Sequence, residues 1–461
     1  MADYDLIVIG SGPGGYVTAI RGSQLGMKVA VVEKAELGGV CLNWGCIPTK
    51  ALLRSAEVYH NMQHADAYGL SANPSFDLDA VVNRSRDIAA QLSKGVQFLL
   101  KKHEIEVIRG HAALKPGEAA PLVTVEGDDH TARHVILASG ARARTLPQIG
   151  LAPDGQFIWT AREAMVPDQI PERLLVIGSG AIGIEFASFF NHFGSDVTVV
   201  EMVDRILPAE DAEISAQAAK MIGKRGIDIR TNTQVESATT AGNAVKIAFD
   251  GDGKGEGEYD RVILAIGIVG NTEDMGLEEL GVEIDRGHVK IDEFSRTGVP
   301  GLYAIGDVTG PPWLAHKASH EGVICVEKIA GLDPHPLDVA NIPGCTYCQP
   351  QVASVGLTEA EAEAAGHAIK VGRFPFIGNG KAIALGEPEG LVKTVFDADT
   401  GELLGAHMIG TEVTELIQGY TVARTLETTE HELIETVFPH PTLSEMMHES
   451  VLDAYDRALH I

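Results

Sequence analysis

The stretch DLIVIGSGPGG, residues 5–15, decides the fold. Its first five residues are almost continuously apolar, as in a buried strand, and the glycine pattern G-x-G-x-x-G follows at once. In that pattern the first glycine makes a tight turn, the second lets the backbone approach a pyrophosphate, and the third lets a helix pack closely. A helical stretch and a second apolar run, residues 29–32, lead to Glu33. This order predicts a βαβ unit that binds a dinucleotide.

The same order returns further along the chain. Residues 174–183 read LLVIGSGAIG, and a helical stretch and another apolar run then lead to Glu201. Gly10 precedes Glu33 by 23 residues, and Gly178 precedes Glu201 by the same 23. One glycine pattern is weak evidence, but two in matching context predict two dinucleotide sites. We interpret both acids as acceptors for ribose hydroxyls, and Glu201 favours NAD over NADP because it would repel a 2′-phosphate.

The rest of the chain divides at about residue 341. Before it, residues 135–140, 262–267 and 301–307 are apolar runs that end in glycine or Gly-Asp. After it, alternating runs at 352–355 and 391–396 predict an antiparallel sheet packed with helices, and a helix from about 444 to 459 ends the chain. The fold class is therefore α/β with an α+β part at the C-terminal end.

Composition narrows the function classes. Lys and Arg number 36 against 64 Asp and Glu, which gives a net charge of −28 and disfavours nucleic-acid and membrane-surface binding. No apolar run reaches 18 residues, and the strand pattern beginning at Asp5 leaves no room for a signal or transit peptide. Five cysteines are too few for a secreted disulfide framework. We expect a cytoplasmic protein without a membrane anchor.

The segment CLNWGC, residues 41–46, is the next signal. Five residues of regular helix rise about 7.5 Å, more than the Cα separation of about 7 Å at which a disulfide stops being possible. Cys41 and Cys46 can therefore bond only if residues 43–45 leave helical geometry. Two thiols held together beside a fast electron acceptor can cycle between dithiol and disulfide. The alternative is two unrelated buried thiols.

Weaker candidates lie elsewhere. In HPTLSE, residues 440–445, Glu445 fits a capping box with Thr442, and His440 fits either a structural histidine or a base. Cys345 and Cys348 have redox or half-zinc spacing but no second ligand pair, so we favour two buried thiols. The histidine pairs 60/64 and 316/320 lack a supporting carboxylate signature, so we expect no metal site.

Taken together, these segments resemble the pyridine nucleotide-disulfide oxidoreductases, a family of flavoenzymes. The resemblance covers the whole chain and is most specific in GGVCLNWGCIPTK, residues 38–50, and in HPTLSE. Both glycine patterns and Gly306-Asp307 support it. Two positions depart from the family: Phe438 stands where a second histidine is frequent, and Ile268 stands where an arginine is frequent. The second departure touches the region expected to contact the nicotinamide cofactor.

The resemblance implies a domain plan and a reaction. Residues 1–148 would form an FAD-binding domain with the redox disulfide, 149–270 an NAD-binding domain, 271–341 a central domain and 342–461 an interface domain. The two dinucleotide-binding domains would be Rossmann-like. The enzyme would oxidise dihydrolipoyl groups to lipoyl groups and pass electrons through FAD to NAD. Its partners would be the lipoyl domains of 2-oxo acid dehydrogenase complexes, or of the glycine cleavage system, and a second copy of the chain.

The resemblance also assigns roles to residues. Cys41 would exchange with substrate, Cys46 would lie against the flavin, and His440, oriented by Glu445, would act as base from the partner subunit. Lys50 would reach the flavin edge and pair with Glu185. The expected FAD contacts are Gly10, Gly12, Gly14, Gly15, Glu33, Lys34, Lys50, Ala112, Gly140, Asp307 and Ala315, and the expected NAD contacts are Gly178, Gly180, Gly183, Glu201, Val235 and Gly267.

Three other functions remain as alternatives. A glutathione-reductase-like enzyme would need cations for an NADP phosphate near Met202, where the nearest is Arg205. A mercuric-reductase-like enzyme would carry a further C-terminal cysteine pair, and no cysteine follows Cys348. A non-catalytic, redox-linked FAD-binding interaction protein would not need Cys41, Cys46 and His440 together.

Overall fold

The apolar run near the N-terminus forms the central strand of a parallel sheet in the computed structural model, which describes residues 2–461. In sheet order the strands are β20 (Leu302–Ala304), β7 (Ala132–Leu137), β1 (Tyr4–Ile9), β2 (Val29–Glu33) and β3 (Glu106–Arg109). Leu6 lies opposite Val29 on one side and His134 on the other, so the ends of β1 and β2 meet at one edge. That edge is where ligands of open α/β sheets bind.

The chain divides into two units. The first comprises residues up to Leu52, Asp77–Arg144 and Gly267–Leu337, and the second comprises Leu53–Phe76, Thr145–Ile266 and Asp338–Ile461. Helix α3 (Cys46–Gln63) begins in the first unit and ends in the second. None of the helices formed by residues 2–461 is long and apolar enough to cross a membrane.

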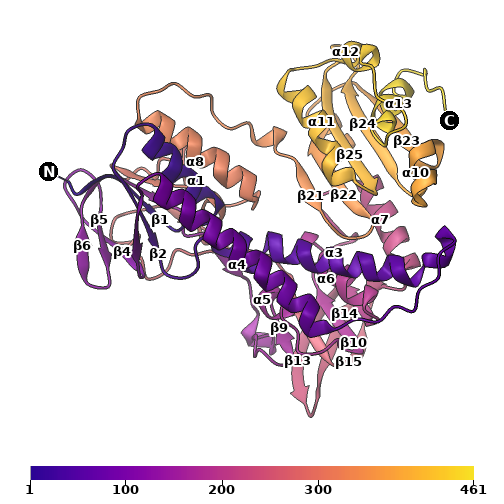
Figure 1. Ribbon diagram of the computed structural model, residues 1–461, viewed down its shortest axis with the longest axis horizontal. Helices are drawn as coiled ribbons and strands as arrows, with labels where there is room; N and C mark the ends of the chain where they lie inside the picture. Colours follow the sequence, from indigo (N-terminus) through magenta and orange to yellow (C-terminus); the bar gives the residue numbers. More distant parts are fainter. Residues whose placement is uncertain (1) are drawn as a thin grey trace. The chain divides into compact units, whose positions relative to one another are not determined.

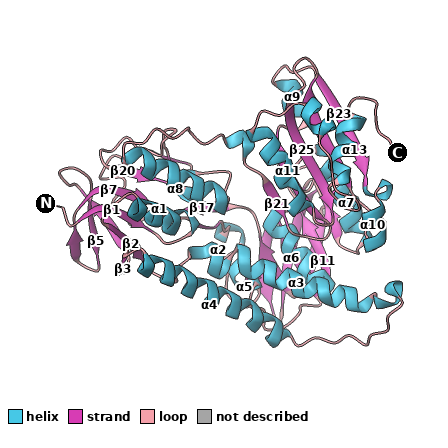
Figure 2. Ribbon diagram, turned by 45° about the horizontal axis from the view of Figure 1, so that its top comes forward, coloured by secondary structure: helices cyan, strands magenta, loops and turns pink. Residues whose placement is uncertain are grey.

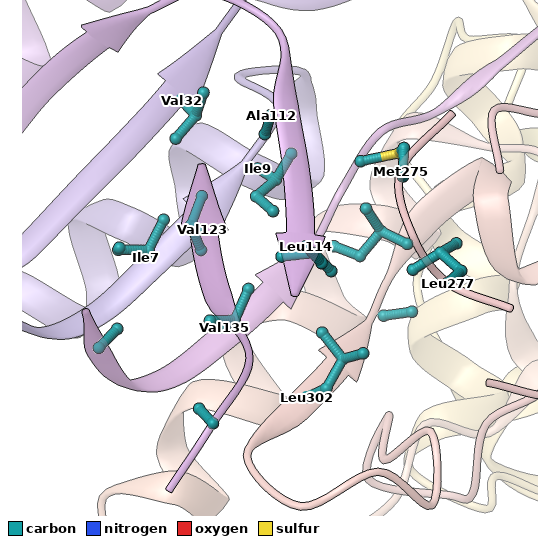
Figure 3. Close-up of a cluster of buried hydrophobic side chains, with 14 of the residues drawn as sticks. Ile7, Ile9, Val32, Ala112, Leu114, Val123, Val135, Met275, Leu277 and Leu302 are labelled. Carbon is teal, nitrogen blue, oxygen red and sulfur yellow. The ribbon is translucent and has the colours of Figure 1, made fainter. Parts of the chain in front are cut away.

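In the first unit, both faces of the parallel sheet are buried. Leu6 and Val8 of β1 pack with helices α1 (Pro13–Gln24) and α8 (Ala315–Ile329), which lie side by side in Figure 1. Ile7 and Ile9 point to the opposite face, where Figure 3 shows them near Val123 and Leu114 of a small antiparallel sheet. Burial on both faces explains the unbroken apolar runs of these strands.

The first unit contains further elements around this sheet. They are α2 (Gly39–Trp44), α4 (Leu78–Lys102), the antiparallel sheet β4 (Ala112–Lys115), β5 (Leu122–Val125) and β6 (Asp128–His130), the pair β8 (Ala141–Ala143) and β17 (Ile268–Gly270), the pair β18 (Ile284–Asp285) and β19 (His288–Val289), and the 3-10 turn η3 (Gly306–Thr309).

The second unit repeats the parallel arrangement. Its strands, in sheet order, are β12 (Asp228–Arg230), β11 (Asp196–Val200), β10 (Arg173–Ile177), β16 (Arg261–Leu264) and β9 (Ile158–Trp159). Accompanying elements are η1 (Ala65–Tyr68), η2 (Pro147–Ile149), α5 (Ala161–Ala164), α6 (Ala181–His192), α7 (Ala212–Lys224) and the antiparallel β13 (Thr233–Ala241), β14 (Ala244–Gly251) and β15 (Gly255–Tyr259). The predicted internal repeat is therefore confirmed.

The C-terminal part of this unit is the predicted antiparallel sheet with helices. Its strand order is β21 (Gly344–Thr346), β22 (Gln351–Gly356), β25 (Leu403–Gly410), β24 (Leu391–Asp397) and β23 (Ile369–Pro375). Helices and turns around it are η4 (Val339–Asn341), α9 (Glu359–Ala364), η5 (Phe376–Gly378), α10 (Gly380–Leu385), α11 (Val413–Thr425), α12 (Glu430–Glu435) and α13 (Glu445–Asp453). Figure 2 shows α11 and α13 beside the sheet, and side chains of both join its core.

The last helix is shorter than the sequence indicates. We expected it to run to about residue 459, but α13 ends at Asp453. Asp456 has a positive φ of 55°, which a helix does not allow, and the chain then folds back. Glu449 accepts hydrogen bonds from the Leu459 amide at 3.0 Å and from His460 at 2.7 Å. The tail thus packs against its own helix instead of extending it.

Candidate active site

The two glycine turns have the same geometry. Gly10 and Gly178 have φ values of 103° and 99°, which favour glycine. A methyl group on Gly15 would lie 1.9 Å from the Gly10 carbonyl oxygen, and one on Gly183 would lie 2.0 Å from the Gly178 oxygen. At Gly12 a methyl group would meet nothing within 4 Å. The first and third glycines therefore bring helix and strand together, while the second faces open space.

The glutamate that follows each βαβ unit accepts hydrogen bonds from the glycine turn of the same unit. Glu33 accepts hydrogen bonds from the amide and hydroxyl of Ser11, at 2.9 and 2.6 Å. Glu201 accepts the same two bonds from Ser179, at 3.0 and 2.7 Å. We did not identify these serines from the sequence. The signal was available, because both patterns read G-S-G, and a hydroxyl at that position reaches the acid.

The open turns and the facing acids suit dinucleotides. Backbone N–H groups at the start of α1 and α6 are orphan donors of a helix N-terminus, which attracts phosphate. Each carboxylate oxygen has two lone pairs, so Glu33 and Glu201 retain capacity to accept ribose hydroxyls. The residues present fit FAD and NAD.

Gly45 breaks the helix between the two cysteines, as the disulfide spacing requires. It separates α2, which carries Cys41, from α3, which begins at Cys46, and its φ and ψ are −152° and −119°. A methyl group there would lie 3.3 Å from the Cys41 Cα atom. The neighbouring Cys46 thiol and burial raise the pKa of Cys41, while the Lys50 charge opposes the rise. The segment holds the two sulfurs together.

Exposure of the two sulfurs differs from what the resemblance implies. In the single chain Cys46 is exposed and Cys41 is half-buried, although Cys41 is the sulfur expected to meet substrate. Asn43 fixes the loop through hydrogen bonds to the carbonyls of Leu37 and Gly39, at 3.0 and 2.9 Å.

Several charged side chains lie together at η3 and the start of α8. Burial raises the pKa of Asp307, and the electrostatic influence of Lys317 and of the nearby His288 opposes the rise. Lys317 forms an ion pair with Glu321 at 3.0 Å, and Glu321 accepts a hydrogen bond from the Gly306 amide at 2.8 Å. Lys317 and Glu321 were missed in the sequence, where their i,i+4 spacing was the available signal.

The other predicted cofactor contacts occupy strand ends and turns. Gly140 and Gly267 both have positive φ, and the Gly267 carbonyl accepts a hydrogen bond from the Arg144 amide at 3.0 Å. In the first unit Gly14 lies in α1, Lys34 follows β2, Ala112 begins β4 and Ala315 begins α8, and in the second unit Val235 lies in β13.

Glu185 is buried in the middle of α6, with 4% of its surface exposed. Its Oε1 atom accepts a hydrogen bond from the Tyr347 amide at 2.9 Å. Lys50, its expected partner, belongs to the first unit, whereas Glu185 belongs to the second. Their pairing stays a prediction.

His440 and Glu445 meet as the sequence suggested. The Nδ1 atom of His440 lies 2.9 Å from Oε1 of Glu445, and the second oxygen accepts the Thr442 amide at 2.9 Å. Burial favours the neutral acid, but the bonds from Thr442 and His440 outweigh it and lower the pKa of Glu445. Glu445 therefore holds His440, but the capping box does not form, because α13 starts at Glu445 with Ser444 as its N-cap and the Thr442 hydroxyl bonds the Pro439 carbonyl and Ser444. The His440 side chain is 79% exposed in the single chain.

The remaining candidates do not form a centre. Cys348 is buried and donates to the Pro350 carbonyl at 2.9 Å, whereas Cys345 is half-buried and directed to the Thr414 carbonyl at 3.9 Å. The rings of His60 and His64 lie 4.2 Å apart. Among residues 2–461, no group of three or more histidine, cysteine or acidic side chains is placed to hold a metal ion.

The chain is similar to known proteins along its whole length. A family model described as pyridine nucleotide-disulphide oxidoreductase matches residues 4–322, and the dimerisation domain of that family matches 342–451. The chain is 58% identical to the dihydrolipoyl dehydrogenase of Zymomonas mobilis, with 100% of both chains covered. It is 57% identical to that of Rhizobium etli, with 99% of each covered. The solved structure of LpdA from Mycobacterium tuberculosis is similar with a TM-score of 0.90 and 29% identity, covering 97% of this chain and 98% of that one.

Proposed function

The chain belongs to the pyridine nucleotide-disulphide oxidoreductase family, and from this premise we propose which of its residues carry the reaction. The enzyme oxidises dihydrolipoyl groups to lipoyl groups and uses FAD and NAD. The observation that carries the residue assignment is that Cys41 and Cys46 lie on either side of the helix break at Gly45, in the same unit as the first glycine turn. The glutathione- and mercuric-reductase-like alternatives and the non-catalytic one are not favoured, since the full-length relatives are dihydrolipoyl dehydrogenases.

The first glycine turn would hold FAD, with Glu33 on its ribose and Asp307 on its ribityl chain, and the second turn would hold NAD, with Glu201 on its ribose. Bound there, FAD would supply a two-electron carrier between a dithiol and NAD. Lys34, Ala112, Gly140 and Ala315 complete the first site in this proposal, and Val235 and Gly267 the second. The boundaries at residues 148, 270 and 341 separate the FAD, NAD, central and interface domains.

Thiol exchange is the part of the reaction that the chain itself performs. In the oxidised enzyme Cys41 and Cys46 share a disulfide. A substrate thiolate bonds to the Cys41 sulfur, the Cys41–Cys46 bond breaks, and Cys46 leaves as a thiolate. The second substrate thiolate then displaces Cys41, closing the lipoyl ring and leaving two reduced cysteines.

His440 accepts the proton that the substrate thiol must lose. The thiolate is the reactive form, and an unperturbed thiol has a pKa of about 8.5, so a base near neutral pH raises its fraction. Glu445 holds Nδ1 of His440 and thereby directs the other ring nitrogen outward. The family's dimerisation domain makes the enzyme a homodimer. We propose that each subunit supplies His440 to the Cys41–Cys46 pair of the other.

The proposal extends to partners and location. Lipoyl domains of 2-oxo acid dehydrogenase complexes, or of the glycine cleavage system, would present the dihydrolipoyl group. Five cysteines are too few for a secreted disulfide framework, so we propose that the enzyme works in the cytoplasm.

Steady-state assays test this function. The holoenzyme should oxidise dihydrolipoamide and lipoyl domains with NAD, and should not turn over glutathione. His440→Gln should lower the rate with dihydrolipoamide by about 10²–10⁴ and leave the FAD content unchanged. His431→Gln, at an exposed histidine of α12, is the matched control and should keep the wild-type rate. Equal rates for the His440 variant and the control would remove His440 from the mechanism.

A further inference from the structure

The segment after β21 runs beside helix α6, the helix that carries Glu185 (Figure 2). Two backbone amides of this segment donate to α6 side chains: Tyr347 to Glu185 Oε1 at 2.9 Å, and Gln349 to Ser188 Oγ at 3.2 Å. Glu185 and Ser188 are each 4% exposed. The segment that follows β21 therefore donates a hydrogen bond directly to Glu185, which is the one acidic side chain of α6 and is buried.

The Tyr347 amide has no role in the sheet. The ladder between β21 and β22 ends with Thr346 opposite Val352, so the next N–H group points out of it. A buried carboxylate is costly unless hydrogen bonds satisfy it, and a backbone donor offers it one fixed direction. Fixing one oxygen of Glu185 also sets where the other points.

We propose that the Tyr347 amide is a positioning group that orients the Glu185 carboxylate. This inference rests on the proposed function and on the role in flavin chemistry that the family resemblance predicts for Glu185. It also explains the Cys345–Cys348 motif, whose spacing first suggested redox or zinc chemistry. Cys345 is directed to the Thr414 carbonyl and Cys348 to the Pro350 carbonyl, so the two thiols anchor the backbone on either side of Tyr347.

An amide-to-ester exchange tests the inference in the holoenzyme. Incorporating the α-hydroxy analogue of tyrosine at position 347 removes the N–H donor and keeps the side chain. The matched control places an ester at Gln349, which removes the bond to Ser188 from the same segment. The readouts are the two-electron reduction potential of the bound flavin and the stopped-flow rate of its reduction by NADH.

The ester at 347 should shift the potential and slow flavin reduction by about tenfold, in keeping with the loss of one hydrogen bond to a buried charge. The ester at 349 should change neither. In a Glu185→Ala background the ester at 347 should have no further effect. Unchanged potential and rate at 347, equal effects of the two esters, or an effect that persists in Glu185→Ala would each overturn the proposal.

A second variant tests the same inference if the ester-containing protein folds poorly. Tyr347→Pro removes the same N–H group, and the extended conformation of Thr346 suits the residue before a proline. It should give the same shift and the same dependence on Glu185, and a normal potential would again overturn the proposal. Turnover of dihydrolipoamide with NAD by the wild type tests the proposed function separately, because the flavin readouts need only NADH.

Discussion

Replacing Lys393 by Met should destabilise the second unit. The Lys393 side chain is 2% exposed, and its ammonium lies 2.9 Å from Asp211, 3.1 Å from Glu213 and 2.6 Å from Glu359. These ion pairs connect β24, in the C-terminal antiparallel sheet, to the start of α7. There Asp211 caps the helix by accepting a hydrogen bond from the Glu213 amide. Methionine fills a similar volume without the charge.

The size of the effect follows from how buried each acid is. Breaking a buried ion pair typically costs about 3–5 kcal/mol because one charge remains uncompensated. Glu213 and Glu359 are each 33% exposed and keep Arg373 as a partner, so water and Arg373 offset much of their loss. The Asp211 side chain is 3% exposed and keeps only backbone donors. We therefore expect a loss near the lower end, about 3 kcal/mol.

Equilibrium denaturant unfolding of the holoenzyme, followed by circular dichroism, measures the change in free energy. Lys254→Met is the matched control, because Lys254 pairs with Asp250 at the surface of the same unit and is 76% exposed. It should cost less than about 0.5 kcal/mol. A loss for Lys393→Met no larger than for Lys254→Met would refute the reasoning.

The pH dependence gives a second check. In the wild type, burial raises the pKa of Asp211, but the bond and charge of Lys393 outweigh it, so the net pKa is lowered. A carboxyl group whose pKa is lower in the folded than in the unfolded protein stabilises the fold above the unfolded pKa, which is about 3.9 for Asp. This stabilisation is lost as the pH falls through the folded-state pKa. In the variant, burial is unopposed by Lys393 and the acid protonates more readily. The difference between the two proteins should therefore shrink between pH 7 and pH 4.

Three further predictions concern the reaction. Cys46→Ser should abolish the long-wavelength absorption band expected on partial reduction, when a Cys46 thiolate lies against flavin; a persisting band would reverse the assignment of the two sulfurs. Glu201→Ala with Met202→Arg should narrow the preference for NAD over NADP in steady-state assays, and equal wild-type rates with both nucleotides would contradict the role of Glu201. Mixing His440→Gln subunits with Cys41→Ser subunits should restore activity, because each heterodimer would contain one intact site. No activity in verified heterodimers would place His440 outside a shared site.

Much of the fold of this protein can be predicted from short stretches of its sequence. Both βαβ units follow from glycines, apolar runs and acids whose spacing is set by the length of one strand and one helix. The break between Cys41 and Cys46 could also be predicted, because five helical residues are too long for a disulfide and glycine allows the departure at position 45. The contact between His440 and Glu445 joins residues five apart, so its alternatives could be stated in advance.

Only the tertiary structure decided the contacts between distant segments. Glu185 is 162 residues from Tyr347, and Lys393 is 182 residues from Asp211. In the sequence, Lys393 is one residue of an alternating strand pattern, and Tyr347 lies between two closely spaced cysteines. Neither a lysine side chain nor a backbone amide indicates which distant group will be its partner. Local spacing determines turns and helices, since their atoms are joined by a few bonds. Which charges become buried together depends on how whole sheets pack, and that is settled only when the chain has folded.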